Sequence, residues 1–345
     1  MKNSPEEQTE IKYSFLVPAF RATKEQLDRA ISPVIDNERS DAEIIIVEAP
    51  YNGELVSSVY RGNPKIVCAV SPVASIPVQR NLCLRLARGE YIIFIDADDY
   101  VCPDFLSVLD SAVERDADAD IIVFQHTGSA FDSPPIGSMC PVRADRKKQI
   151  LAYFCSANKR RPHFSEKSLW AKAYKRNAVI ESKTFFDNAL ISTQDHFFNL
   201  RLIHFTHKVV FYPECKVYHY EFSNQSITKQ LKTSSPERFD LLLSAWEKLN
   251  NEFTPSSAEM QNWAFNLVLV YLPSMLNGYF IPLSKESHNN VAAWKRVVKK
   301  KPYQRAIRTL HFWSCPNAPR LLLLLAFKLR LYSLIYHLYS HKKLR

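Results

Sequence analysis

Three carboxylates stand in a four-residue run directly after an apolar segment. Asp96, Asp98 and Asp99 follow residues 92–95, which are all Ile or Phe. An uninterrupted apolar run of this kind is typical of a strand buried on both faces, and such strands end at the crevice where α/β proteins bind ligands. Carboxylates this close repel one another unless a positive group lies between them. We therefore interpret the run as a site for a hard divalent cation, held by one or two carboxylates and the phosphates of a substrate.

A helix N-cap is the alternative interpretation of the same residues. Asp is a favourable N-cap residue, and residues 103–106 have the composition of a helix start. Asp99 alone would serve that role, but a cap does not account for Asp96 and Asp98. The cation and phosphate interpretation is therefore favoured.

The elements that must position these carboxylates alternate between strands and helices. Crossover connections of this type indicate an α/β fold with a mostly parallel sheet. Residues 128–145 are rich in Pro, Gly, Ser and Asp and are expected to form a loop. The expected strands are 13–17, 43–47, 65–70, 91–95, 121–125, 208–212 and 216–220, and the expected helices are 24–35, 79–88, 105–115, 146–160 and 166–178.

The chain of 345 residues is long enough for two domains. Residues 1–12 are expected to be disordered, and the polar start of the chain shows no signal peptide. Ser, Thr, Lys and Pro cluster at 225–235, and only helical patterns follow. We expect an α/β domain over 13–230 and a helical region over 231–345.

Positive charge is concentrated in the C-terminal region. Residues 287–345 hold thirteen Lys or Arg and no Asp or Glu, whereas the first 286 residues carry 32 basic and 35 acidic side chains. An anionic partner, either a membrane or a nucleic acid, is therefore expected for this region. The seven cysteines are scattered without metal-ligand spacing, which is typical of reduced thiols in a cytosolic protein.

Two apolar stretches lie in the same region. Residues 265–283 are interrupted by Asn266, Pro273, Asn277 and Gly278, so we expect a buried helical hairpin or an interfacial element rather than a membrane span. Residues 320–344 combine leucines with Lys, Arg and Tyr. Such a helix suits an anionic membrane surface, and the alternative is that its apolar face packs on the protein.

Residues 13–225 resemble family 2 glycosyltransferases of the GT-A fold, notably bacterial enzymes of surface-polysaccharide and lipooligosaccharide assembly. Any one of the matching segments is a weak signal, but together they follow the order of the family. The sequence departs from the family pattern at Arg21, at Gln194 and in the turn after Glu48. The matching segments are Pro18-Ala19-Phe20-Arg21, Val47-Glu48, Gln79-Arg80-Asn81, Gly89-Glu90-Tyr91, Asp96-Ala97-Asp98-Asp99 with Pro103-Asp104, Trp170-Ala171-Lys172-Ala173-Tyr174 and Gln194-Asp195-His196-Phe197-Phe198.

The resemblance implies a nucleotide-sugar site at the first strands. Pro18 and Phe20 would line it, with Phe20 stacked on a pyrimidine ring. Glu48 would accept the imide hydrogen of that ring, and Arg80 would contact phosphate or base with its planar donor fork. Each has a bland alternative: a core aromatic for Phe20, a solvated strand end for Glu48 and a surface helix residue for Arg80.

The resemblance also implies a metal site and a catalytic base. Asp98 would bind Mn²⁺ or Mg²⁺, which acts as the Lewis acid on the diphosphate, and Asp96 would bind ribose or the metal through water. His219 would be a further metal ligand or phosphate donor, although a lone His is more often structural. Asp195 is the candidate general base, because apolar neighbours on its helix would raise its pKa; the alternative is an N-cap.

On the acceptor side, Trp170 and Gln194 are the candidates, and Trp170 is alternatively a core residue. The expected function is an inverting, metal-dependent glycosyltransferase that uses a nucleotide-sugar, probably a UDP-sugar, and a glycan or glycolipid acceptor. Two other classes stay open: an inactive GT-A protein that serves as a binding scaffold, and a nucleotidyltransferase. We expect a cytoplasmic location at the inner face of the membrane and no nucleic-acid partner.

Overall fold

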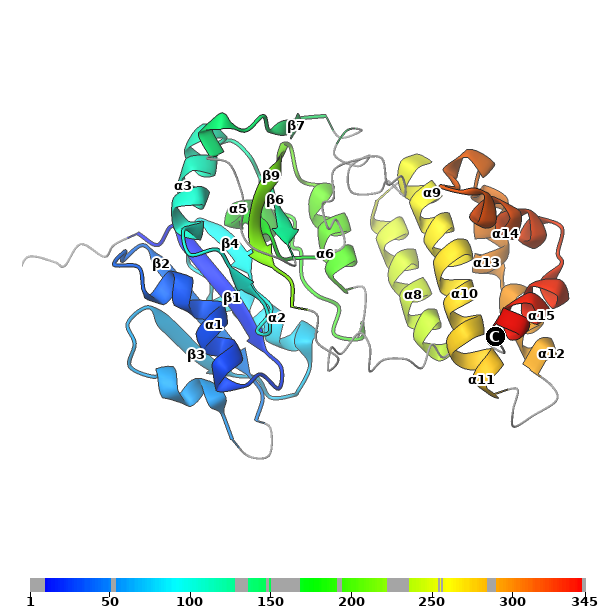
Figure 1. Ribbon diagram of the computed structural model, residues 1–345, viewed down its shortest axis with the longest axis horizontal. Coiled ribbons are helices and arrows are strands. Elements are labelled where there is room, and N and C mark those ends of the chain that lie inside the picture. The colour runs from blue at the N-terminus through cyan, green and yellow to red at the C-terminus, as the bar shows by residue number, and fades with distance from the viewer. Residues whose placement is uncertain are drawn as a thin grey trace, which may run out of the picture. The chain divides into compact units, whose positions relative to one another are not determined.

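The computed structural model describes residues 10–50, 54–127, 136–146, 149, 168–190, 194–221, 236–253, 255, 257–283 and 290–342. These residues fall into two compact units, one within 10–221 and the other within 236–342 (Figure 1). The expected disorder at 1–9, most of the expected helix at 146–160 and the expected boundary near 225–235 lie outside the described residues. The domain bounds therefore stay a prediction.

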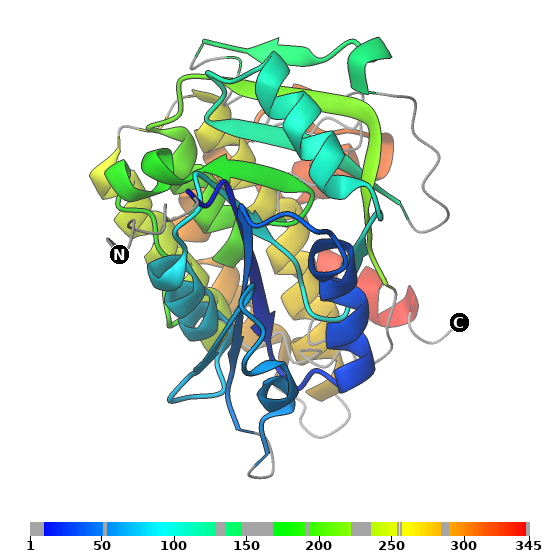
Figure 2. The same ribbon diagram turned by 90° about the vertical axis from the view of Figure 1, so that its left-hand side faces the viewer.

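The first unit is built on one mixed sheet, and its nine strands in the described residues have the order β3-β2-β1-β4-β8-β6-β9-β5, with β7 beside β9 (Figure 2). Strands β3, β2, β1 and β4 are parallel, and β8 lies antiparallel between β4 and β6. The strands are β1 Tyr13–Ala19, β2 Ala42–Glu48, β3 Ile66–Val70, β4 Tyr91–Phe94, β5 Tyr100–Val101, β6 Ile121–Thr127, β7 Val142–Ala144, β8 Lys172–Lys175 and β9 Val209–His219.

Helices flank this sheet, as expected for an α/β fold. The first begins with a capping box between Thr23 and Gln26 and buries an apolar stripe against the sheet. The helices of this unit are α1 Lys24–Ile35, α2 Ile76–Leu86, α3 Phe105–Arg115, α5 Arg176–Glu181 and α6 Gln194–Ile203, with the 3₁₀ turns η1 Val56–Tyr60 and η2 Ile136–Ser138.

Three local expectations in this unit are wrong. The loop expected over 128–145 holds the 3₁₀ turn η2 and the strand β7 in its described part. Residues 166–178 were expected to be one helix, but its described part holds strand β8 followed by the start of α5; Ala171, at φ 54°, turns the chain into the strand. Strand β9 is continuous through Pro213, where two strands were expected. Its register against β6 shifts from Val123 paired with Phe211 to Gln125 paired with Lys216, so the extra residues around the proline bulge out of the ladder.

Gly89 is required by a close approach of two strands. A Cβ atom at this position would lie 2.6 Å from the main-chain nitrogen of Ser14. The Gly89 amide instead donates a hydrogen bond of 2.7 Å to the Ser14 hydroxyl, which donates to Glu43. The glycine thus lets β4 start directly beside β1.

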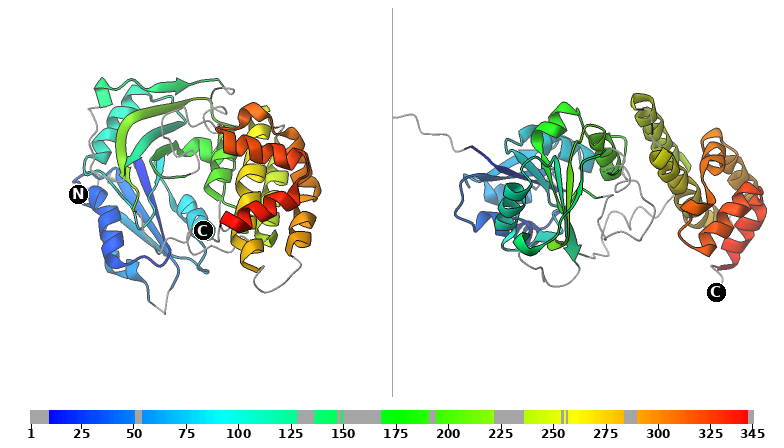
Figure 3. Two further views of the ribbon diagram at one scale, coloured as in Figure 1. Left: turned by 45° about the vertical axis from the view of Figure 1, so that its right-hand side comes forward. Right: turned by 90° about the horizontal axis from the view of Figure 1, so that it is seen from above.

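The second unit is helical throughout its described residues, as expected (Figure 3). Within this part of the chain no helix is long and apolar enough to span a membrane. Its elements are α8 Pro236–Glu252, α9 Ser257–Phe265, the π-helical turn η3 Asn266–Tyr271, α10 Leu272–Met275, the π-helical turn η4 Leu276–Phe280, α11 Ile281–Leu283, α12 Asn290–Val298, α13 Lys301–Thr309, the 3₁₀ turn η5 Phe312–Ser314, α14 Ala318–Lys328 and α15 Tyr332–Lys342.

The segment from α9 to α11 is one continuous helical run rather than a hairpin. Its expected burial is confirmed, because Leu267, Leu272 and Leu276 are fully buried. Pro273 lies inside this run, directly after the π turn η3, and π turns and prolines both interrupt the regular hydrogen-bond ladder of a helix. The two π turns on either side of α10 absorb the irregular pattern that indicated a hairpin.

The tail forms two helices where one was expected. Helix α14 ends in a Schellman arrangement, in which the amide of Leu331 donates to the carbonyl of Ala326 and Arg330 has φ 58°. Glycine usually occupies such a left-handed position, and Arg330 gives no sign of it in the sequence. Helix α15 then starts in a new direction.

Candidate active site

The acidic run lies where β4 ends, as the sequence predicts. Ile95 still donates its amide to the carbonyl of Leu16 on β1, and the amide of Asp99 then donates to the carbonyl of Asp96, which closes a tight turn. The short strand β5 follows and pairs with the end of β9. The carboxylates therefore lie at the carboxyl edge of the parallel strands.

Asp99 anchors this turn and does not cap a helix. It is 1% exposed, and its carboxylate accepts hydrogen bonds of 2.8 Å from the Tyr218 hydroxyl and from the Glu221 amide. Burial and the charge of Asp96 raise its pKa to about 8. Helix α3 starts at Phe105 with Asp104 in the N-cap position, so the N-cap interpretation of Asp99 is wrong.

Asp98 is the candidate cation ligand, and that role stays a prediction. Burial, and next the charge of Asp96, raise its pKa. In the described chain it makes no ion pair with Lys or Arg. The nearby Arg29 instead donates from Nη2 to the Asp98 carbonyl at 2.9 Å, and its Nη1 lies 3.3 Å from a Glu221 oxygen. This arrangement holds the turn in place without neutralising its carboxylate.

Arg80 connects Asp96, in the acidic turn at residues 96–99, to Asp195, the candidate general base. The side chain comes from the first half of α2 and is 4% exposed. Its Nη2 lies 2.9 Å from Asp96 Oδ1, and its Nη1 forms an ion pair with Asp195 Oδ1. The surface alternative for Arg80 is therefore wrong. The two carboxylates, from the ends of β4 and the start of α6, share one buried guanidinium.

Asp195 has the environment expected of a general base. It lies in the first turn of α6 and its side chain is 23% exposed. Burial raises its pKa, and Arg80 opposes that shift. A raised pKa suits a carboxylate that removes a proton from a hydroxyl, and the general-base role of Asp195 stays a prediction.

His219 lies close to the end of the acidic turn at residues 96–99, because β5, which follows that turn, pairs with β9. It is directly opposite Tyr100, and the two rings stack with centroids 4.4 Å apart and planes 17° apart. Its Nε2 lies 3.7 Å from a Glu221 oxygen. Strand pairing thus places His219 opposite Tyr100, which is the second residue after Asp98.

The donor set fits a metal that is completed by substrate. Among the described residues, no three His, Cys, Asp or Glu side chains are grouped closely enough to hold an ion alone. Mg²⁺ and Mn²⁺ in nucleotide sites take one or two carboxylates together with phosphate oxygens. Asp98 is the candidate carboxylate of an open site of that kind, and the metal-binding parts of Asp96 and His219 stay predictions.

The end of β1 lies on the same edge of the sheet. Pro18 is buried in the strand and Phe20 is partly exposed directly after it. Arg21 adopts the left-handed conformation at φ 56°, with its guanidinium 5.2 Å from the centre of the Phe20 ring. The stacking role of Phe20 stays a prediction.

Glu48 has a different task from the one expected. It is 2% exposed, and its two oxygens accept hydrogen bonds from the amides of Val56 at 3.1 Å and Ser57 at 2.8 Å. It therefore anchors the turn η1 that follows β2. This geometry argues against a direct contact of Glu48 with a base, because the carboxylate is already satisfied and enclosed.

Sequence reasoning missed Gln79. Its side chain is fully buried, and neither polar atom of its amide has a hydrogen-bond partner among the described residues. Cys83, one turn further along α2, touches the Ile45 carbonyl of β2. Since α2 runs back along the parallel strands, Gln79 lies nearer the carboxyl edge than Cys83 does. An uncharged glutamine beside Arg80 carries no local sign of burial, so the sequence alone could not single it out.

Trp170 and Gln194 are both largely buried. The Trp170 indole is 9% exposed and stacks on Tyr218, with ring centroids 5.0 Å apart. This favours the core alternative, and an acceptor sugar would reach only the edge of the ring. Gln194 is 6% exposed, and its Oε1 accepts no hydrogen bond. Their acceptor-side roles stay predictions.

Two other residues of the matching segments hold the site's loops. Asn81 accepts from the Phe186 amide at 2.8 Å and donates to the Phe186 carbonyl at 2.9 Å, which ties the segment before α6 to α2. Lys172 is 1% exposed and donates to the Ser168 carbonyl at 2.6 Å. Both side chains position the segments that carry Asp195 and Trp170.

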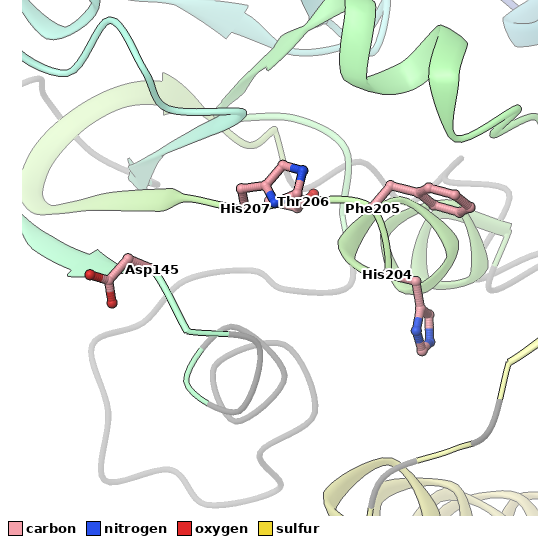
Figure 4. Close-up of a pocket in the computed structure, with 5 residues that line it drawn as sticks. All are labelled: Asp145, His204, Phe205, Thr206 and His207. Atoms are coloured by element: carbon pink, nitrogen blue, oxygen red, sulfur yellow. The ribbon is translucent and has the colours of Figure 1, made fainter.

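A pocket of about 410 Å³ lies elsewhere in this unit (Figure 4). It is found where α6 ends and β9 begins. Strand β9 is parallel to β6, and β6 and β4 are both antiparallel to β8, so the start of β9 lies at the edge opposite the acidic turn. The pocket is therefore separate from the carboxylates; its lining residues are Asp145, His204, Phe205, Thr206 and His207.

Comparison with known proteins gives one family and one fold. Residues 14–181 match the family described as "Glycosyl transferase family 2". Over 157 residues the chain is 29% identical to a Bacillus subtilis (strain 168) protein described as "Putative glycosyltransferase EpsH". That match covers 44% of this chain and 43% of EpsH, so it spans less than half the length of that relative.

Among solved structures, the fold is similar to S. aureus TarS 1–349 in complex with UDP-GlcNAc. The TM-score is 0.60 at 14% identity, with 96% of this chain and 91% of TarS 1–349 covered. It is also similar to the mannosyltransferase PcManGT from Pyrobaculum calidifontis in complex with GDP-Man and Mn²⁺. There the TM-score is 0.51 at 14% identity, with 95% and 88% covered. Both likenesses establish the GT-A fold.

Proposed function

We propose that this chain, whose residues 14–181 match glycosyl transferase family 2, is an inverting, metal-dependent glycosyltransferase. Its donor is a nucleotide-sugar, and we propose a UDP-sugar because the structural relative TarS was solved with UDP-GlcNAc. The acceptor is a glycan or glycolipid of the cell surface. The family match argues against the nucleotidyltransferase alternative.

One observation carries this proposal. Arg80 forms ion pairs with both Asp96, in the acidic turn, and Asp195, on α6. Sugar transfer needs a charged diphosphate to be held on one side and an acceptor hydroxyl to lose its proton on the other. The ion pairs of Arg80 hold the Asp96 and Asp195 carboxylates at a fixed separation. A single displacement requires the diphosphate and the acceptor hydroxyl to be positioned in this way. An inactive scaffold protein would have no need of this arrangement.

Each residue has a role in the proposed reaction. Asp98, with Asp96 and His219, would hold Mn²⁺ or Mg²⁺, which neutralises the departing diphosphate when bound. The partly exposed Phe20 ring would stack on the nucleobase of the donor. The Asp195 carboxylate accepts the proton of the acceptor hydroxyl as the oxygen attacks the anomeric carbon. Inversion follows because the attack comes from the face opposite the diphosphate.

We further propose that the acceptor is met at the inner surface of the cytoplasmic membrane. The support is the basic C-terminal region and the exposed leucines on its last two helices. A nucleic-acid partner is not part of the proposal.

A donor screen tests the reaction. UDP-, GDP-, CDP- and ADP-sugars are incubated with the protein and Mn²⁺ or Mg²⁺, and slow hydrolysis and thermal stabilisation are measured. We expect a UDP-sugar to give both signals only when the metal is present. Asp98→Ala should remove both, and the matched control Asp118→Ala, at an exposed position on the opposite edge of the sheet, should keep them. Stabilisation without any turnover, across donors and acceptors, would support the scaffold alternative instead.

A further inference from the structure

The last two helices have one buried face and one exposed face. Leu324 and Phe327 of α14 and Ile335 and Tyr336 of α15 are at most 5% exposed and pack inside the second unit. The opposite sides of the same helices, with the turn between them, carry leucines that are 39% to 64% exposed. We refer to these as the leucine face: Leu321, Leu322, Leu325, Leu329, Leu331, Leu334 and Leu338.

The two helices share one support. Helix α14 packs against the π turn η3, and α15 packs against the π turn η4 of the same continuous helical run. The two helices also contact each other, and they lie side by side in front of that run (Figure 3). Because both rest on one support, their outer sides form a single apolar surface. Contiguous exposed apolar surface of this kind marks an interaction site.

Aromatic side chains lie at one border of the leucine face. Trp313 in η5 is 80% exposed and Phe312 is 45% exposed. The Lys328 ammonium group lies 5.4 Å from the centre of the Phe312 ring, which places η5 beside the last turn of α14. Exposed Trp next to cationic side chains is typical of the boundary between water and lipid.

The charge around the leucine face has one sign. No Asp or Glu occurs in residues 287–345, which contain both helices and η5. Helix α13, which contacts α14, presents exposed Lys301, Arg305 and Arg308 at the spacing of one helix side. Such a surface attracts anions and repels a second copy of itself.

We propose that the leucine face docks on an anionic lipid bilayer, with the leucines and Trp313 entering the interface and the basic side chains meeting lipid phosphates. The proposal gives residues to the membrane setting proposed above and does not depend on sugar transfer. A second copy of the chain is disfavoured by like charge. Exposed leucines have no use in binding a nucleic-acid backbone.

Vesicle co-sedimentation tests this with the full chain. The vesicles contain phosphatidylcholine alone or with phosphatidylglycerol, at low and high salt. The variant Leu322→Glu/Leu338→Glu is compared with Val59→Glu/Leu241→Glu, which places the same charges at exposed apolar positions outside the leucine face. Removal of the tail is a poor test, because it would also remove Leu324, Phe327 and Ile335 from the core.

We expect the parent chain and the control variant to pellet with anionic vesicles and to be released by salt. The leucine-face variant should lose at least tenfold in partitioning while it keeps its melting temperature. Vesicles should shift the tryptophan emission of the parent to the blue, and Trp313→Phe should remove most of that shift.

Three results would overturn the proposal. The first is equal pelleting of the leucine-face variant and its control. The second is binding to phosphatidylcholine alone that equals binding to anionic vesicles, which would remove the charge argument. The third is a dimer in sedimentation velocity that Leu322→Glu/Leu338→Glu dissociates, with no vesicle binding by the parent, which would assign the face to a second copy. Hydrolysis of a soluble donor, measured in parallel, reports the proposed reaction separately.

Discussion

Asp195→Asn separates the proposed proton transfer from donor binding. The substitution keeps the size of the side chain and one oxygen for Arg80, but it removes the basicity. General-base catalysis contributes about 10²–10⁴-fold, which corresponds to about 3–5 kcal/mol of transition-state stabilisation. We expect turnover to fall by that factor and the dissociation constant for UDP to change little, because the base acts on the acceptor.

Arg80 is shared by Asp96 and Asp195, and this limits how much unfolding free energy the substitution should remove. Breaking a buried ion pair outright costs about 3–5 kcal/mol, but Arg80 keeps Asp96 at 2.9 Å in this variant. The loss of stability should therefore be well below that range. Thermal unfolding of the variant, beside the control Asp118→Asn at an exposed pair with Lys208, checks this.

The assay is steady-state transfer with calorimetric UDP binding, both as a function of pH. Burial raises the pKa of Asp195 despite Arg80. Activity of the parent should therefore decline on the acid side at a pH above the ordinary range of Asp, and the variant should lack this limb. If Asp195→Asn instead lost UDP affinity at unchanged turnover, Asp195 would be a nucleotide ligand and the reasoning would be refuted.

Four further substitutions test other parts of the structure. Asp98→Ala should abolish Mn²⁺-dependent UDP binding in calorimetry, and metal-dependent binding that survives would exclude Asp98 as a ligand. Hydrogen bonds from Arg39, Lys12 and Tyr13 outweigh burial and hold the pKa of Asp110 at about 2. Asp110→Asn should therefore cost about 2 kcal/mol of unfolding free energy at pH 7. The folded state binds fewer protons than the unfolded state here, so this difference should shrink as the pH falls through 4 towards 2, and a cost independent of pH would contradict the assignment. Arg330→Gly should stabilise the protein by about 1 kcal/mol, because glycine adopts the left-handed conformation at the end of α14 without steric cost; a lower melting temperature would contradict this reasoning. Gln79→Met should raise the unfolding free energy by about 1–3 kcal/mol by removing a buried amide without partners, and destabilisation in urea unfolding would mean that the amide is satisfied.

Local patterns in the sequence predicted most of the first unit. The strands before residue 127 are apolar runs and the helix at Lys24–Ile35 has a clear amphipathic period, so both could be recognised without tertiary information. Strand β8 could not, because Lys172-Ala173-Tyr174 becomes a strand only through the free edges of β4 and β6. The break at Arg330 was hidden because an arginine occupies a position that glycine usually marks.

The sequence predicted several residues of the candidate site but not the contacts between them. The acidic run, Arg80 and Asp195 all lie at one edge, as the order of the segments indicated. The bond of Asp99 to Tyr218 joins residues 119 positions apart, and Arg80 joins Asp195 over 115 positions. No local pattern encodes such pairs. The same is true of Glu48, whose partners Val56 and Ser57 are main-chain amides that a sequence does not distinguish.

The position of β8 has a consequence for synthesis on the ribosome. Strands β4 and β6 leave the exit tunnel first, but they do not pair with each other, and each keeps an open edge until Lys172–Lys175 arrives between them. Open edges of apolar strands are prone to wrong pairing. The turn after β4 can form its hydrogen bonds only later, because its partners Tyr218 and Glu221 are translated at the end of the unit. The nascent chain therefore cannot complete its carboxylate turn before the whole sheet has been translated, and premature termination within this unit would yield a protein with exposed strand edges and no assembled site.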